Sequence, residues 1–308
     1  MMTLDDFRSA RERIAPYVRK TPVHPLPGGP LLKLESLQVT GSFKARGAFN
    51  HVLAQREACA RGIITASSGN HGQAVAYVAR TLGLRAIVVV PEDVATTKAE
   101  AITAAGAELI RWGRYSEERV PHAKELAERR GLHYVPPYDD LFIIAGQGTA
   151  GLEIVEQCPE VEVVVVPVSG GGLISGVAAA VKSLRPRVRV IGAEPAGATR
   201  FASSRRAGRP VVLEKGETIA DGLRVLTPGH LTWDMTTKYV DEFREVPDDD
   251  TLKALRRILL DGHVLAEPSG AVSVACALSG RLTGSTAVAV VSGGNVDLEV
   301  LRRALGPS

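Results

Sequence analysis

Lys44 is the side chain in this sequence best placed for covalent chemistry. It lies in the stretch GSFKARGA, residues 41–48, beside Phe43, where an apolar, turn-prone segment gives way to a helical pattern. A lysine amine that loses solvation has a lowered pKa, so it is more often neutral and able to form an imine. A surface lysine whose stem packs while its amine reaches water fits the same junction. Three glycine-rich turns further along the chain distinguish the two interpretations.

The first turn is SSGNHGQA, residues 67–74, which follows the apolar run GIITAS and opens a helical pattern. The free N–H groups at the start of a helix suit an anion the size of a carboxylate, and Gly69 and Gly72 allow that anion to approach closely. Asn70 adds a side-chain donor. The alternative is an ordinary strand-to-helix turn with an asparagine cap.

The second turn is SGGGL, residues 169–173, between the apolar run VEVVVVPV and a helical pattern. Three consecutive glycines at the start of a helix form a concave group of N–H donors that suits a phosphate. The turn lacks the GK[ST] ending of nucleoside triphosphate loops, and its spacing does not match the dinucleotide fingerprint. The phosphate must therefore belong to another kind of molecule.

The third turn is SGGN, residues 292–295, directly after the apolar run AVAVV. The Ser292 hydroxyl can donate a hydrogen bond to a ring nitrogen without carrying charge. A reactive lysine, a phosphate cradle and an uncharged partner for a ring nitrogen are together what pyridoxal phosphate requires. The combination predicts this cofactor more strongly than any one part does.

The motifs GSFKARGA, SSGNHGQA, IAGQGT, SGGGL, ETIADGL, AEPSGA and SGGNVD stand in the order found in fold-type II pyridoxal-phosphate enzymes. Over nearly its whole length the chain resembles the threonine dehydratase and serine racemase family of this group. The resemblance implies an α/β fold of the tryptophan synthase β type, with the cofactor in the cleft between two domains. The residues that it assigns to the cofactor are the Schiff-base lysine Lys44, its ring-packing neighbour Phe43, Asn70 at the phenolic oxygen, Gly170, Gly171, Gly172 and Leu173 at the phosphate, and Ser292 at the pyridine nitrogen.

The same resemblance implies β-elimination from L-threonine or L-serine, giving a 2-oxo acid and ammonia. It assigns the substrate to Ser67, Ser68, Gly69, Asn70, His71, Arg119 and Gly222. Ser68 leaves an alternative open, because a hydroxyl across the cofactor from Lys44 can return a proton to the opposite face and give a racemase. Ser68 can also simply cap the helix. Arg119, in YSEER, can receive a second carboxylate, which would suit 3-hydroxyaspartate. A catalytically silent ligand-binding protein is the remaining alternative.

Members of the family that bind a divalent cation hold it with a glutamate, an alanine carbonyl and a further carboxylate. Glu194 and Ala198 match the first two, but Arg200 stands where the carboxylate is expected. Since an arginine cannot be a metal ligand, two arrangements remain. Either Arg200 points away and water completes the site, or its guanidinium occupies the place of the cation beside Glu194.

The composition is that of a globular protein, with 45% hydrophobic and 23% charged residues and a net charge of +3. Basic residues occur in scattered pairs without interleaved aromatic residues, so we expect no nucleic-acid partner. Neither a signal peptide nor a membrane span is expected, which predicts a cytoplasmic protein. The chain ends at Ser308 without a regulatory domain, as in the short catabolic members of the family, and we expect a homodimer or homotetramer. Cys59, Cys158 and Cys276 fit buried thiols better than disulfides or zinc ligands.

The elements that must position these residues alternate between strand and helix, which predicts two open, doubly wound and mostly parallel sheets. We expect a large cofactor-binding domain from residues 1–49 and 139–308, and a small substrate-binding domain from residues 50–138. The predicted strands are 31–35, GIITAS, RAIVVV, ELIRW, LHYVPP, VEVVVVPVS, 189–193 and 287–291. The predicted helices are 4–18, 44–60, 70–82, 96–105, 116–130, 143–157, 173–184, 199–206, 250–263, 269–279 and 297–305.

Overall fold

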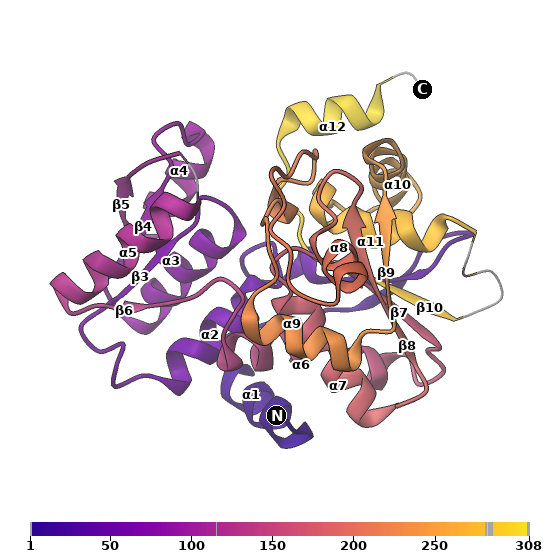
Figure 1. Ribbon diagram of the computed structural model, residues 1–308, viewed down its shortest axis with the longest axis horizontal. Coiled ribbons are helices and arrows are strands. Elements are labelled where there is room, and N and C mark those ends of the chain that lie inside the picture. The colour runs from indigo at the N-terminus through magenta and orange to yellow at the C-terminus, as the bar shows by residue number, and fades with distance from the viewer. Residues whose placement is uncertain (1, 115, 281, 283–285, 307–308) are drawn as a thin grey trace.

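The computed structural model describes residues 2–114, 116–280, 282 and 286–306, and their strands form two sheets (Figure 1). The larger sheet contains, in spatial order, β1 (Val23–Pro25), β2 (Leu31–Leu34), β10 (Ala287–Val291), β7 (Val163–Pro167), β8 (Arg189–Pro195) and β9 (Glu242–Val246). The smaller sheet contains β5 (Glu108–Arg111), β4 (Ala86–Val90), β3 (Ile63–Ala66) and β6 (His133–Tyr134). The strands pair in parallel except β1, which is antiparallel to β2. The predicted fold class is confirmed.

Helices cover both faces of each sheet. They are α1 (Leu4–Ile14), α2 (Lys44–Ala54), α3 (Asn70–Leu82), α4 (Thr96–Ala104), α5 (Ser116–Arg130), α6 (Leu141–Gln157), α7 (Gly172–Leu184), α8 (Arg200–Ala207), α9 (His230–Tyr239), α10 (Asp248–Leu260), α11 (Pro268–Leu278) and α12 (Leu298–Leu305). Two short 3-10 helices, η1 (Glu35–Leu37) and η2 (Asp221–Leu223), lie in connections. Because β7 is covered on both faces, every one of its residues is buried, which explains its unbroken run of apolar side chains.

The predicted helices and strands are all present, with different ends in several places. The first helix ends at Ile14 instead of residue 18, because Pro16 has no N–H with which to continue the ladder of helical hydrogen bonds. The helix that begins at Lys44 ends at Ala54, and residues 55–61 form successive turns. The prediction missed β1, α9 and β9. The sequence of β9, EFREV, contains three charged residues and no regular alternation, which an edge strand with one neighbour tolerates.

The two sheets lie apart in Figure 1, with α2 and α6 between them. The chain between residues 63 and 134 supplies the smaller sheet, and both ends of the chain supply the larger one. The domain boundaries at residues 50 and 138 stay a prediction, and residue 50 falls inside α2, which packs against both α3 and α6.

Two further expectations concern the chain as a whole. Cys59, Cys158 and Cys276 lie buried as thiols, as predicted. In the described part of the chain, no helix combines the length and the apolar character needed to cross a membrane.

Each glycine-rich turn directly follows the carboxyl end of a parallel strand. The turn at residues 67–74 follows β3, the one at 169–173 follows β7, and the one at 292–295 follows β10. In open parallel sheets, ligands bind at this edge. The topology therefore places the three turns where a shared ligand can reach them.

Candidate active site

Lys44 is the first residue of α2, and its amine is drawn into the molecule. Its Nζ donates a hydrogen bond to the Pro137 carbonyl oxygen at 2.6 Å and lies 5.2 Å from the centre of the Phe43 ring. Burial lowers the pKa of Lys44 to about 8. The interpretation as a snorkelling surface residue is therefore wrong, and the amine is neutral in a substantial fraction of molecules near neutral pH.

A buried ionic cluster fixes the start of α2, and its members come from α2, α6, β2 and η1. Arg46 donates from Nε to Glu35 at 2.8 Å and from Nη1 to Glu153 at 2.7 Å, and Lys33 donates to Glu153 at 2.6 Å. Burial works against the charge on Arg46, but the two carboxylates outweigh it and hold its pKa above the ordinary value. The cluster therefore ties α2 to α6, β2 and η1 at a position two residues after Lys44.

The turn after β10 is hydrogen-bonded to the segment that carries Lys44. The Phe43 N–H donates to the Ser292 carbonyl oxygen at 3.0 Å, and Ser42 pairs with Gly293. The Ser292 hydroxyl is buried and lies 3.5 Å from the Ser269 carbonyl oxygen. These contacts bring the predicted ring-nitrogen partner beside the predicted Schiff-base lysine.

Asn70, the first residue of α3, is held from both ends of its amide. Its Nδ2 donates to Glu267 at 2.6 Å, and its Oδ1 accepts from Asn295 Nδ2 at 2.7 Å. The helix cap is Gly69, which has no side chain to bond the free N–H groups at the start of α3, and in the described part of the chain the only side-chain hydrogen bond at the cap is from Ser67. Both capping alternatives, one for Asn70 and one for Ser68, are therefore wrong.

Glu267 was not predicted, although it lies in the AEPSGA motif. It is 5% exposed, and its pKa is raised to about 8 by burial and by the nearby Asp221. Its carboxyl group is thus largely protonated at neutral pH. Because Asn70 has a second amide hydrogen, its bond to Glu267 leaves one donor for a ligand. The signal that could have found Glu267 is its place in a motif that carries the family resemblance.

The turn before α7 fits a phosphate group. Gly171 caps the helix with a φ of 96°, which favours glycine. A Cβ atom on Gly170 would lie 2.5 Å from the Tyr138 ring, and one on Gly171 would lie 2.6 Å from Phe201. The hydroxyl of Ser169 is buried in the same turn without a hydrogen-bond partner. An unpaired hydroxyl and the free N–H groups of a helix start suit an anion.

Tyr138 and Pro137 connect this turn with Lys44. Tyr138 packs against Gly170 and Gly172, while the carbonyl of Pro137 accepts the Lys44 amine. The sequence analysis assigned no role to this segment, PPYDD, at residues 136–140. Its contacts place the phosphate turn and the lysine on two sides of the same short segment.

The other predicted substrate residues make hydrogen bonds within the protein. His71 accepts or donates a hydrogen bond with the Val135 carbonyl oxygen at 3.1 Å, and burial together with the charge of Lys44 lowers its pKa to about 3. Ser67 accepts from the Gly69 N–H at 3.3 Å, and Gly222 donates to Ser269 at 3.0 Å. Arg119 is buried in α5 and donates to the Arg114 carbonyl oxygen at 2.6 Å. Their roles toward a substrate stay predictions.

Glu194 and Arg200 lie together and are fully buried. The two oxygens of Glu194 accept the N–H groups of Phe201 and Ala202 at the start of α8, at 2.9 and 2.8 Å. The guanidinium of Arg200 points inward, with Nε 3.8 Å from Glu194, and it donates to the Ala198 carbonyl oxygen. These residues do not fit a divalent cation, since the arginine already uses the carbonyl that would bind it.

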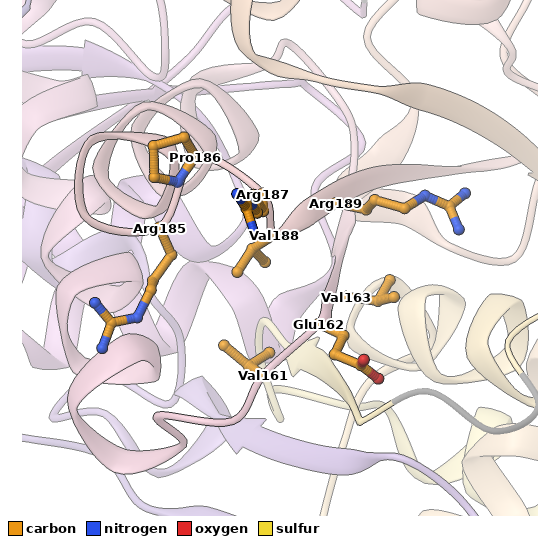
Figure 2. A pocket seen from close by; sticks show the side chains of 8 residues that line it. All are labelled: Val161, Glu162, Val163, Arg185, Pro186, Arg187, Val188 and Arg189. Atoms are coloured by element: carbon orange, nitrogen blue, oxygen red, sulfur yellow. The ribbon is translucent and has the colours of Figure 1, made fainter.

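A separate cavity of about 590 Å³ lies at the amino ends of β7 and β8 (Figure 2). Arg185 and Arg189 line it, but Figure 2 shows their guanidinium groups pointing in opposite directions. Arg189 is paired with Glu242 at 2.8 Å. The cavity is therefore at the wrong edge of the sheet for the chemistry of Lys44, and its cations do not converge on one ligand.

The fold and the residues around Lys44 are those of an enzyme that binds pyridoxal phosphate. A family model described as "Pyridoxal-phosphate dependent enzyme" matches residues 14–293, and the chain belongs to this family. The L-threonine ammonia-lyase of Thermotoga maritima is 40% identical over 312 residues, which cover 98% of this chain and 78% of that protein.

Solved structures agree with this assignment. The structure of maize serine racemase has a TM-score of 0.93 and 39% identity, and the match covers 98% of this chain and 96% of that one. The crystal structure of the T.th. threonine deaminase has a TM-score of 0.91 and 40% identity, and the match covers 96% of this chain and 99% of that one. The chain is thus similar to a lyase and to a racemase at nearly equal distance.

Proposed function

We propose that this enzyme uses pyridoxal phosphate to eliminate water from L-threonine or L-serine, releasing 2-oxobutanoate or pyruvate together with ammonia. The observation that carries the proposal is the position of the Lys44 amine, with its lowered pKa, between the turn before α7 and the turn after β10. Lys44 would bind the aldehyde of the cofactor. The other residues that would hold the cofactor are Phe43, Asn70, Gly170, Gly171, Gly172, Leu173 and Ser292, with Ser169 added by its unpaired hydroxyl.

When bound, pyridoxal phosphate supplies an aldehyde for the substrate amine and a ring system that accepts the electron pair of the Cα–H bond. Lys44 would take the Cα proton, acting as general base. The N–H groups at the start of α3, with Ser67 and His71, would hold the substrate carboxylate. Lys44 would pass the Cα proton on to the β-hydroxyl, which would leave as water as the Cβ–O bond breaks and the Cα–H electron pair forms a Cα=Cβ bond. The Lys44 amine would then displace the product nitrogen from the aldehyde, and a second water would hydrolyse the freed product to ammonia and the oxo acid.

Ser292 favours elimination over transamination. Its hydroxyl is a neutral partner, so the ring nitrogen has no carboxylate there to stabilise a proton on it. An unprotonated ring withdraws electrons less strongly from Cα. Loss of the β-hydroxyl then competes well with reprotonation.

Racemisation is the second candidate, and a specific observation favours it. Ser68 is half-buried and is not the cap of α3, so its hydroxyl is not committed to the helix. It could return a proton to the face of Cα opposite Lys44. Maize serine racemase, whose structure is similar to this one, is named for that activity. The third candidate substrate, 3-hydroxyaspartate, depends on Arg119.

The test incubates the purified enzyme separately with L-serine, L-threonine and 3-hydroxyaspartate, and follows oxo acid, D-enantiomer and uptake of solvent deuterium at Cα. We expect oxo acid from L-threonine or L-serine as the main product, and no reaction with Lys44→Ala. If D-serine forms faster than pyruvate, the enzyme is mainly a racemase. Absence of visible cofactor absorbance, or full activity of Lys44→Ala, would remove the proposal altogether.

Two further features belong to the same proposal. We expect the enzyme to work in the cytoplasm and to form a homodimer or homotetramer. Light scattering coupled to size-exclusion chromatography of the holoenzyme measures the assembly, and a monomer at working concentration contradicts it.

A further inference from the structure

Arg200 is one of the largest fully buried side chains in the described part of the chain, and its guanidinium donates hydrogen bonds to backbone carbonyl oxygens. Its exposed fraction is 0%. Nη1 donates to the Val168 carbonyl oxygen at 2.9 Å, and Nη2 donates to the carbonyl oxygens of Leu223, at 2.7 Å, and Ala198. The nearby carboxylate of Glu194 balances the charge. A buried charge of this size is costly unless it is paired in this way.

Three carbonyl oxygens and one carboxylate are also the kind of donor set that proteins use for a hard cation. Here the guanidinium already binds all three carbonyl oxygens and faces the carboxylate. A divalent ion could not bind these oxygens while the guanidinium occupies them, and the positive charge of the guanidinium would repel it. We propose that Arg200 is a built-in cation that replaces a metal ion and makes the enzyme independent of divalent cations.

The three carbonyl groups belong to segments that meet at the site. Val168 directly precedes Ser169 and the phosphate turn, and Leu223 directly follows Gly222. Ala198 lies between β8 and α8. Arg200 is thus a positioning residue, because its hydrogen bonds join Val168, just before the phosphate turn, to Leu223 in η2. Phe201, its neighbour in α8, packs against Gly171 and adds a second contact to the same turn.

Cation binding can be tested without any assumption about the substrate, so failure of this inference and failure of the proposed function are distinguishable. We expect the wild-type holoenzyme to bind no Mn²⁺ in paramagnetic resonance titrations. Its thermal midpoint should be the same in EDTA, Mg²⁺ and Ca²⁺, and its activity should be unchanged by EDTA. Binding of Mn²⁺ that Glu194→Gln removes would overturn the proposal, as would a wild-type midpoint that falls in EDTA.

The variant Arg200→Asp tests the replacement directly, because it removes the guanidinium and supplies the third kind of oxygen ligand. We expect its midpoint in EDTA to fall and to rise by roughly 5 °C in Mg²⁺ or Ca²⁺ at one hundred times the Kd. The matched control is Arg206→Asp, also on α8, where the side chain is 66% exposed. That control should show no response to cations.

The cofactor gives a second readout. Arg200→Asp in EDTA should bind pyridoxal phosphate roughly tenfold more weakly than wild type, and Ca²⁺ should restore the affinity. A folded Arg200→Asp protein that ignores every divalent cation contradicts the proposal. If this variant does not fold under any condition, the Mn²⁺ titration of the wild-type enzyme decides the question alone.

Discussion

The pKa of Lys44 should set how fast the apoprotein takes up pyridoxal phosphate, because only a neutral amine attacks an aldehyde. Burial lowers this pKa from 10.5 to about 8. At pH 7 an amine with a pKa of about 8 is neutral in about one molecule in ten, against about three in ten thousand for a pKa of 10.5. The neutral fraction of Lys44 is therefore about 300 times that of an exposed lysine.

The assay mixes apoprotein with pyridoxal phosphate across a pH series and follows the visible absorbance of the bound cofactor. Because the pKa is lowered, we expect the rate constant to rise about tenfold per pH unit below pH 8 and to level off above it. The rate at which Nα-acetyl-lysine reacts with pyridoxal phosphate, measured in the same pH series, corrects for protonation of the cofactor itself. A corrected rate that keeps rising through about pH 10 would refute the lowered pKa and the burial that causes it.

Three substitutions test other parts of the site. Gly170→Ala should weaken cofactor binding at least about tenfold, since its Cβ would lie 2.5 Å from the Tyr138 ring; unchanged affinity in an absorbance titration would show that the ring moves aside freely. Glu153→Gln should lower the free energy of unfolding, measured in urea, by about 3–5 kcal/mol, because it removes one charge of a buried cluster. The control Glu156→Gln, on the exposed face of α6, should lower the free energy of unfolding by less than about 1 kcal/mol. Ser68→Ala should reduce D-serine formation more than pyruvate formation in chromatographic assays, and equal losses would take Ser68 out of the racemisation step.

Local patterns were sufficient to predict most of the fold. The helices Asn70–Leu82 and Ser116–Arg130 and the strand Ala287–Val291 have the predicted ends, because each begins or ends at a glycine, a charge cluster or a change of period. The position of each glycine-rich turn at a strand end follows from the same patterns. Element ends that depend on packing were less accurate, as in the helix that ends at Ala54.

Contacts between distant segments could not be read from the sequence. Asn70 and Glu267 are 197 residues apart, and Asn70 and Asn295 are 225 apart, so no spacing rule brings them together. Nothing in the GSFKARGA motif indicates that Arg46 is buried and paired with two carboxylates from other elements. The sequence is compatible with two orientations of the Arg200 side chain. Hydrogen bonds to backbone carbonyl oxygens hold it in the inward orientation.

Burial shifts the pKa values of the ionisable groups at the centre in the directions that favour their uncharged forms. Burial lowers the pKa of Lys44 to about 8 and, with the charge of Lys44, that of His71 to about 3, while burial and Asp221 raise that of Glu267 to about 8. Ser292 adds a hydroxyl that is neutral at any working pH. At pH 7 His71 and Glu267 are therefore largely uncharged, whereas the Lys44 amine is neutral in about one molecule in ten. We infer that the uncharged forms of His71, Glu267 and Ser292 near a bound ring would favour loss of the β-hydroxyl over holding the electron pair of the Cα–H bond on the ring.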